Sequence, residues 1–237
     1  MSSGFTIYPL GDYAITIEFG DEINHTTNQK VLSLFHYLQS NPFQGQLDLI
    51  PAYTTLTVVY DVSQLKRHYP TTQTVYDWLE QHVLYILQTQ QLKFLPTTRS
   101  VSIPVCYHQT LAPDIQWLAH QHKITEDQVI SLHTGTTYNV YMLGFLPGFP
   151  YMATVPEQLV TPRKNNPRKL VPAGSVGIAG NQTGIYPFAS PGGWQLIGQT
   201  PIKIFDVKKK EAALLQPGDE VTFYSISLEE FNHQQQT

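Results

Sequence analysis

Charged residues are scarce in this chain of 237 residues. Asp, Glu, Lys and Arg make up 14% of it, against about 25% in a typical soluble domain. Neutral polar residues stand in their place, with 22 Gln and 24 Thr. The formal net charge of −4 gives no electrostatic case for binding nucleic acid or an anionic membrane. Hydrophobic residues, at 41%, are enough for a packed core and exclude a disordered chain.

Cysteine and long apolar runs are also nearly absent. The single cysteine, Cys106, excludes a disulfide framework and a cysteine-based zinc site. No run approaches the roughly 18 apolar residues that a membrane helix needs. No Lys or Arg precedes Lys30, so the basic region of a signal peptide is missing. We therefore expect a soluble, cytoplasmic protein.

The first 96 residues have the pattern of a small α/β domain. Alternating apolar and polar residues predict four strands, at 5–9, 13–19, 47–52 and 55–61. Apolar residues at helical spacing predict a helix over 26–39, capped by Thr26 or Thr27, and another over about 72–89. The order ββαββα favours an α+β sandwich with its helices on one sheet face. Polar residues Gln88–Gln91 and then Pro96 mark a boundary, which divides the chain into domains 1–96 and 97–237.

The second domain opens with two short predicted helices and continues as β structure. Thr125 and Gln128 have the spacing of a capping box, and Gly135 ends the second helix. A DNA-binding helix-turn-helix is disfavoured because residues 111–135 hold one base, Lys123, against three acids. We expect the Gln-rich tail, 234–236, to be frayed. The expected helices cover 114–121 and 125–133, and the expected strands cover 99–106, 137–145, 174–179, 194–198, 201–206 and 220–226.

Proline and glycine are concentrated in residues 141–201, which hold 9 of the 17 Pro and 9 of the 15 Gly. This pattern of short β-prone pieces between Gly and Pro points to a β-barrel or sandwich. The stretch has five charged residues, of which only Glu157 is an acid, and it has no His, Asp or Cys. It therefore cannot supply a carboxylate pair or a Ser-His-Asp set from its own residues.

Familiar catalytic and nucleotide-binding motifs are missing. No Lys follows a Gly, which excludes a Walker A loop, and no Gly-x-Ser-x-Gly elbow occurs. The glycines Gly174, Gly177 and Gly180 have the wrong spacing for a dinucleotide fingerprint. The nine histidines show no metal-ligand pattern, so we predict no metal site.

The chemistry left to residues 141–201 suits the binding of a small polar anion. Arg163 and Arg168 offer planar, always-charged forks, and each follows a proline that stiffens the backbone. Glycines bring backbone N–H groups close to a ligand. The alternative is that the Pro and Gly serve only the turns of a barrel and that the basic residues are solvated. The candidate binding residues are Arg163, Arg168, Gly174, Ser175, Gly177, Gln182 and Tyr186, and we expect Phe149, Pro191 and Trp194 in the core or in a contact between subunits.

Five motifs in this stretch carry a resemblance to a known family. They are MLGFLPGFPY at 142–151, TPRKNNPR at 161–168, VPAGSVGIAG at 171–180, QTGIYP at 182–187 and SPGGWQLIG at 190–198. Together they resemble the family of the 5-oxoprolinase B subunit, KipI and allophanate hydrolase subunit 1, to which a module of urea carboxylase is related. Pro9–Asp12 and Leu215–Asp219 also fit, so the resemblance covers nearly the whole chain. Cys106-Tyr-His-Gln departs from the family pattern, which has a Gly pair after the Tyr.

The resemblance implies a fold and a reaction. The fold is a small N-terminal α/β domain followed by a cyclophilin-like β-barrel. The reaction is the hydrolysis of 5-oxoproline to glutamate, driven by ATP, in a heteromeric complex with the C-type and A-type subunits of 5-oxoprolinase. This chain alone is expected to be inactive. ATP enters as a substrate of that complex, and no ATP-binding residue of this chain follows from the resemblance.

Three other functions stay open from the sequence. A KipI-like inhibitor of a sensor histidine kinase would carry nearly the same motifs. A hydrolase component for urea-derived substrates would also do so, with a biotin-carboxylase partner. A prolyl isomerase rests on fold analogy alone, and no isomerase motif is present.

Overall fold

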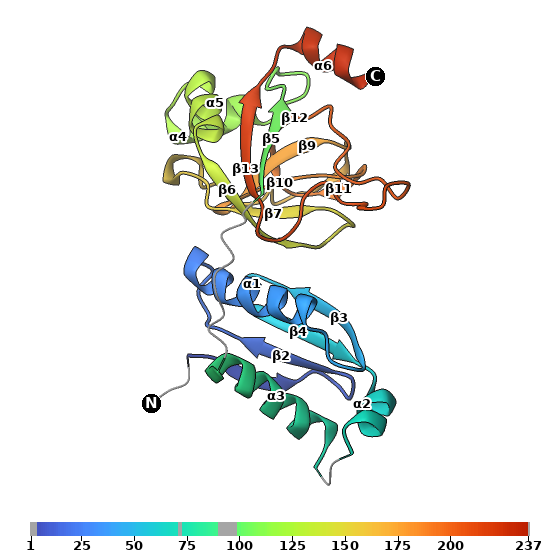
Figure 1. Ribbon diagram of the computed structural model, residues 1–237. Helices are drawn as coiled ribbons and strands as arrows, with labels where there is room; N and C mark the ends of the chain where they lie inside the picture. The colour runs from blue at the N-terminus through green and yellow to red at the C-terminus, as the bar shows by residue number, and fades with distance from the viewer. Residues whose placement is uncertain (1–3, 71–72, 90–98, 237) are drawn as a thin grey trace. The chain divides into compact units, whose positions relative to one another are not determined.

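The computed structural model describes residues 4–70, 73–89 and 99–236. Contacts divide the chain into two compact units, residues 1–97 and 98–237. The predicted boundary between residues 96 and 97 lies outside the described residues. Both units combine helices and strands, which confirms the mixed α and β fold class, while the cyclophilin-like assignment stays a prediction (Figure 1).

The first unit is an antiparallel sheet with helices. Its four strands have the order β1-β2-β4-β3. The strands are β1 (Thr6–Pro9), β2 (Ala14–Glu18), β3 (Gln46–Pro51) and β4 (Thr55–Tyr60), and the helices are α1 (His25–Ser40), α2 (Val62–His68) and α3 (Val75–Thr89).

One face of this sheet carries the core of the unit. Ile15 and Ile17 of β2 pair with Val58 and Leu56 of β4, and all four are fully buried. The buried residues of α1 and α3 belong to the same cluster, so both helices cover this face, as the alternating pattern predicted. The predicted cap of α1 was wrong. The side chain of Asn24, rather than Thr26 or Thr27, accepts from the backbone N–H of Thr27 at 2.8 Å.

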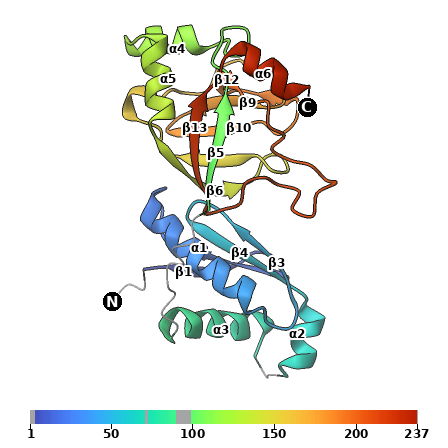
Figure 2. The same ribbon diagram turned by 45° about the horizontal axis from the view of Figure 1, so that its top comes forward.

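The second unit is built on a sheet with the strand order β12-β9-β10-β7-β6-β13-β5. Strands β5 and β13 lie side by side and parallel, although far apart in sequence (Figures 1 and 2). Hydrogen bonds in both directions between Cys106, just past β5, and Gln199 of β12 bring the two edges together, so the sheet is a nearly closed barrel. Strands β8 and β11 pair with each other in a separate two-stranded sheet. The strands of the unit are β5 (Ser100–Val105), β6 (Thr137–Leu143), β7 (Pro150–Ala153), β8 (Arg168–Val171), β9 (Ser175–Ala179), β10 (Gln182–Ile185), β11 (Ser190–Gly192), β12 (Gln195–Gln199) and β13 (Glu220–Ser225).

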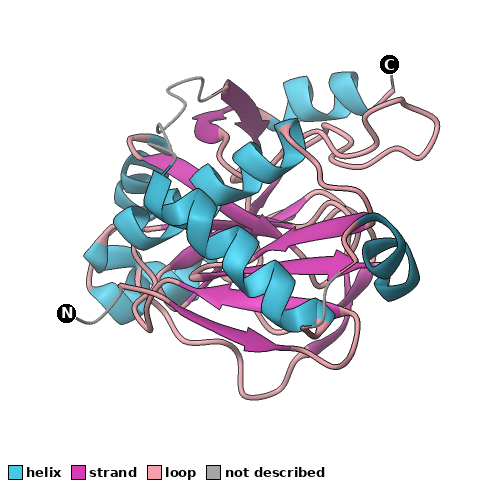
Figure 3. Cartoon of the chain, turned by 60° about the horizontal axis from the view of Figure 1, so that its bottom comes forward, coloured by secondary structure: helices cyan, strands magenta, loops and turns pink. Residues whose placement is uncertain are grey.

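Most strands of this unit are short. Loops connect the helices and strands of the chain (Figure 3). Four of the strands, β7, β8, β10 and β11, were not predicted, because each has only three or four residues and has a Pro or Gly within it or next to it. The predicted strand 201–206 was wrong. Its residues form turns, and only Phe205 makes an isolated bridge, to Ala213.

The helices of the second unit include α5, which confirms the sequence signals predicted for both of its ends. They are α4 (Ile115–His122), α5 (Glu126–Thr134) and α6 (Leu228–Gln235), with a 3-10 turn, η1, at Glu157–Leu159. Thr125 and Gln128 form the predicted capping box, and Gly135 ends α5. Ser227 and Glu230 form a second capping box, which starts α6. Because α6 continues to Gln235, the predicted fraying of 234–236 was wrong for the first two of these residues.

A buried histidine links α5 to the barrel. The Tyr107 hydroxyl lies 2.7 Å from Nδ1 of His133, and Nε2 lies 3.1 Å from Oγ1 of Thr183. Since the Thr183 hydroxyl donates to the carbonyl of Gly177, Nε2 carries the ring proton and Nδ1 accepts from Tyr107. Burial lowers the pKa of His133 to about 3, so the ring is neutral in the folded protein.

We expect His133 to make the barrel sensitive to acid. The unfolded chain binds a proton on this residue near pH 6.5 and the folded chain does not, so stability is lost as the pH falls from about 6.5 towards 3. The free energy of unfolding should decrease by up to about 1.4 kcal/mol per pH unit from this group. Urea denaturation at several pH values measures the slope. The variant His133→Gln should have a lower free energy of unfolding at pH 7.5 and should lack this part of its dependence on pH. The same dependence on pH in the variant and the wild type would contradict the assignment.

Candidate functional site

The segment 161–168, which we call the Arg loop, is fastened to the barrel at two points. Thr161 and Gly180 exchange backbone hydrogen bonds in both directions, at 2.7 and 3.2 Å. Further along, the N–H of Lys164 donates to the carbonyl of Gly193 at 2.7 Å. The backbone on both sides of Arg163 is therefore held in place, as the two prolines of this segment predicted.

A buried carboxylate anchors the far end of the Arg loop. Asp114, 4% exposed, accepts from Nη2 of Arg168 at 2.7 Å, from Nζ of Lys164 at 3.1 Å and from the backbone N–H of Leu196 at 2.7 Å. Burial alone would raise the pKa of Asp114, but these hydrogen bonds and the charge of Arg168 outweigh it, so the pKa is lowered. Asp114 is thus an ionised structural group rather than a proton donor.

Arg163 is the exposed cation of the Arg loop. In the described part of the chain its guanidinium makes no ion pair, in contrast to Arg168 and Lys164. Burial raises the pKa values of the Tyr151 and Tyr186 phenols, and the positive charge of Arg163 acts against this rise in both. The backbone agrees with this electrostatic effect, because Lys164 is hydrogen-bonded to Gly193 and a Cβ on the adjacent Gly192 would collide with the Tyr186 hydroxyl. Arg163 is thus an exposed cation on a loop that approaches Tyr186.

A cluster of aromatic residues lies beneath the surface next to the Arg loop. Phe149, Tyr186 and Trp194 are buried and belong to one small core. Phe149 meets Tyr186 and Trp194 edge to face, with ring centroids 5.2 and 5.4 Å apart, and Tyr151 contacts both Phe149 and Trp194. Phe149 and Trp194 are thus buried in this core, whereas Pro191 of β11 is exposed.

Arg168 and Gly174 have partners within the chain. Arg168 is bound to Asp114, and its Nη1 is buried without a hydrogen-bond partner, so its fork does not face solvent. Gly174 has a positive φ of 78°, and a Cβ there would collide with the carbonyl of Thr200. Its N–H donates to the carbonyl of Tyr186 at 2.7 Å and is not available to a ligand. Both residues shape the site rather than offer a fork or an N–H to a ligand.

The remaining predicted binding residues are spread along two strands. Gly177 lies in β9 between Gly184 and Leu196, and Ser175, 2% exposed, begins the same strand. Gln182 begins β10, whereas Tyr186 follows its end, so about 13 Å of extended strand separates them. The structure thus brings the Arg loop to Tyr186 through Gly193 and Gly192, but it does not bring Gln182 to Tyr186.

Sequence reasoning missed Asp114 and Tyr151. Asp114 begins the predicted helix 114–121 and occupies the N-cap position of α4, where an acid ordinarily caps the helix. Its side chain makes no cap hydrogen bond, because the Arg loop and β12 use it instead. The separation of about fifty residues between Asp114 and its cations leaves no local signal for this pairing.

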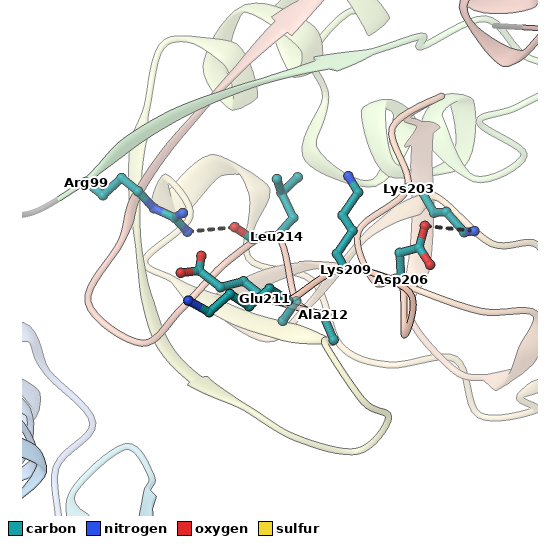
Figure 4. A pocket seen from close by; sticks show the side chains of 9 residues that line it. Arg99, Lys203, Asp206, Lys209, Glu211, Ala212 and Leu214 are labelled. Atoms are coloured by element: carbon teal, nitrogen blue, oxygen red, sulfur yellow. Dashed lines mark hydrogen bonds and ion pairs between the residues drawn. The ribbon is translucent and has the colours of Figure 1, made fainter.

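A cavity of about 340 Å³ lies elsewhere on the second unit (Figure 4). Its charges are of both signs, and several are paired. Lys203 contacts Asp206 at 3.4 Å, while Arg99 donates to the carbonyl of Leu214 and pairs with Asp219. The lining residues of the cavity are Arg99, Lys203, Asp206, Lys209, Lys210, Glu211, Ala212, Ala213 and Leu214.

The described residues hold neither a metal cluster nor a membrane-spanning helix. Over residues 4–70, 73–89 and 99–236, no group of three or more His, Cys, Asp or Glu side chains is placed to hold a metal ion. Within the same ranges, no helix has the length and apolar character needed to cross a bilayer.

Comparison with known proteins identifies the family. Residues 5–215 match the model of the carboxyltransferase domain, subdomain C and D. The chain is 40% identical over 237 residues to the B subunit of 5-oxoprolinase from Bacillus subtilis (strain 168), a match that covers 98% of this chain and 97% of that protein. It is 38% identical over 216 residues to the B subunit of 5-oxoprolinase from Escherichia coli O157:H7, a match that covers 91% of this chain and 94% of that one.

A solved structure agrees with this result. The crystal structure of TTHA0988 superimposes with a TM-score of 0.77 and 36% sequence identity over 90% of this chain, which spans 40% of the TTHA0988 chain. The resemblance drawn from the five motifs is thereby confirmed. The chain belongs to the carboxyltransferase domain, subdomain C and D, family and, within it, groups with the 5-oxoprolinase B subunits.

Proposed function

We propose that this chain is the B subunit of an ATP-dependent 5-oxoprolinase that converts 5-oxoproline into glutamate. Two relatives with this name match over more than nine tenths of both chains. The structural observation that carries the proposal is Arg163, an exposed guanidinium on a backbone fastened on both sides. A fixed planar fork of this kind suits a carboxylate, and 5-oxoproline carries one.

The chain's own part in the reaction is to bind and orient the substrate. A lactam is a poor electrophile, and phosphorylation of its oxygen at the expense of ATP creates a better leaving group. Residues 141–201 hold only one acid, Glu157, and Asp114 is neutralised by its two cations. We therefore assign the general acid, the general base and the phosphoryl transfer to the A-type and C-type subunits, and no step of ATP hydrolysis to this chain.

Reconstitution tests the function. The chain should co-purify with a C-type and an A-type subunit of 5-oxoprolinase, and the assembled complex should release glutamate from 5-oxoproline only when ATP is present. Turnover of a urea derivative instead of 5-oxoproline by the complete set would overturn the proposal. Inhibition of a cognate histidine kinase without 5-oxoproline turnover would favour a regulatory protein.

Arg163 is the residue that we expect to bind the carboxylate. Arg163→Lys keeps the charge but removes the two-pronged fork, so it should lower kcat/KM for 5-oxoproline about tenfold, given that a charge-assisted hydrogen bond contributes roughly 1.5–3 kcal/mol. Steady-state kinetics of the reconstituted complex measure this. The control, Lys209→Gln, removes a cation from the cavity on the same unit and should leave kcat/KM unchanged. Wild-type kinetics for Arg163→Lys in an intact complex would contradict the assignment.

Asp114 is the positioning residue of the same site. Asp114→Asn leaves two partly buried cations without a counterion, so it should lower the free energy of unfolding by about 3 kcal/mol. The Arg loop should loosen, which raises KM for 5-oxoproline more than it lowers kcat. Urea denaturation and kinetics measure the two effects. The matched control, Asp206→Asn, breaks the exposed pair with Lys203 and should cost less than about 1 kcal/mol. Equal losses in the two variants would refute the role of Asp114.

A further inference from the structure

Phe145 holds its ring on a backbone that non-glycine residues rarely adopt. Its φ is 65°, in the left-handed region, where a Cβ crowds the following carbonyl. Phenylalanine has no polar side-chain atom to stabilise this conformation, as asparagine has. A backbone outlier of this kind justifies a hypothesis of function when the fold does not require the side chain.

The loop around Phe145 is closed without any contribution from the ring. The N–H of Leu146 donates to the carbonyl of Gly144 at 2.7 Å, and the N–H of Phe149 donates to the carbonyl of Leu146 at 3.0 Å. Gly144 in turn donates to the carbonyl of Phe149 at 3.1 Å. The Phe145 side chain is 60% exposed, so it adds little to the core. Neither the turn nor the core requires an aromatic residue here.

The ring nevertheless has a defined orientation. Phe145 stands almost perpendicular to two buried rings, at 88° to Phe149 with centroids 5.6 Å apart and at 89° to Tyr186 with centroids 6.4 Å apart. Edge-to-face contacts of this kind are favourable and hold a ring upright. The ring of Phe145 is thus an exposed apolar surface that is held in place by the aromatic cluster.

Arg163 and Phe145 flank the same phenol. The N–H of Lys164, next to Arg163, donates to the carbonyl of Gly193, and a Cβ on the neighbouring Gly192 would collide with the Tyr186 hydroxyl. The Arg loop therefore approaches Tyr186 from one side, and the ring of Phe145 contacts the same phenol. A ligand whose anion meets Arg163 would place its apolar part towards the cluster from which Phe145 rises. Building on the function proposed above, we propose that Phe145 is a specificity-determining residue, whose ring packs against the ring carbons of a small cyclic carboxylate held by Arg163.

Phe145→Gly tests the proposal, because glycine adopts this φ without strain. The thermal midpoint should stay the same or rise. KM for 5-oxoproline in the reconstituted complex should rise about tenfold with little change in kcat, since the lost contact is uniform binding. The control is Val207→Ala, which trims an exposed apolar residue, 77% exposed, outside the cluster. It should leave KM unchanged. A lowered midpoint in Phe145→Gly would assign the ring to the fold and overturn the proposal, as would an unchanged KM.

Calorimetric titration of the assembled complex separates this proposal from the function on which it rests. The probes are 5-oxoproline and acetate, which share a carboxylate and differ in the ring. Phe145→Gly should weaken 5-oxoproline binding and leave acetate binding unchanged, whereas Arg163→Lys should weaken both. This pattern without turnover by the wild type would reject the 5-oxoprolinase function and retain the role of Phe145. Turnover by the wild type with equal 5-oxoproline affinity in Phe145→Gly would reject the role of Phe145 alone. If the wild-type complex binds neither 5-oxoproline nor acetate, the proposed role of Phe145 would also be rejected.

Discussion

The buried carboxylate of Asp114 joins three parts of the second unit that are distant in sequence. It lies at the start of α4, accepts the backbone N–H of Leu196 in β12, and pairs with Lys164 and Arg168 of the Arg loop. A carboxylate that loses water on burial has to be compensated by hydrogen bonds and opposite charge. These three partners satisfy that condition, and in doing so they fix the loop that carries Arg163. The binding surface thus depends on a charge cluster that does not itself face a ligand.

The scarcity of charge elsewhere has a structural counterpart. The barrel interior uses neutral hydrogen bonds, as in the chain from Tyr107 through His133 to Thr183 and the carbonyl of Gly177. Such a chain satisfies its polar groups in a low-dielectric interior without an ion pair. Glycines let strands and loops approach closely, and at Gly174 a side chain would meet the backbone of Thr200. The low content of charged residues and the glycines of residues 141–201 thus match a barrel that is held by neutral hydrogen bonds and close backbone contacts.

In the function proposed above, this site is the substrate-binding part of an active site that other subunits complete. It combines one exposed guanidinium, two phenols and an aromatic wall, and its nearby carboxylate is already paired. These groups can hold and orient a small carboxylate, but they offer no obvious proton acceptor for bond cleavage. The proposed function therefore assigns acid-base chemistry and phosphoryl transfer to other chains of a complex.

Local sequence patterns determined the long elements and the chemical type of the site. Helices α1 and α3 and strands β2 and β4 followed from apolar periodicity, and the capping box of α5 followed from Thr125 and Gln128, because these signals act over a few residues. The five motifs of residues 142–198 carried the family. The short strands β7, β8, β10 and β11 did not follow, since three or four residues are too few to show a period-two pattern.

The tertiary structure alone decided which cation is free. In the sequence Arg163 and Arg168 are equivalent, each following a proline. Folding brings Asp114 to Arg168 and leaves Arg163 exposed beside Tyr151 and Tyr186. It also gave the N–H of Gly174 a carbonyl partner and set Phe145 upright on a buried cluster. Charge pairing and ring packing depend on distances between residues far apart in the chain, and composition and spacing do not specify those distances.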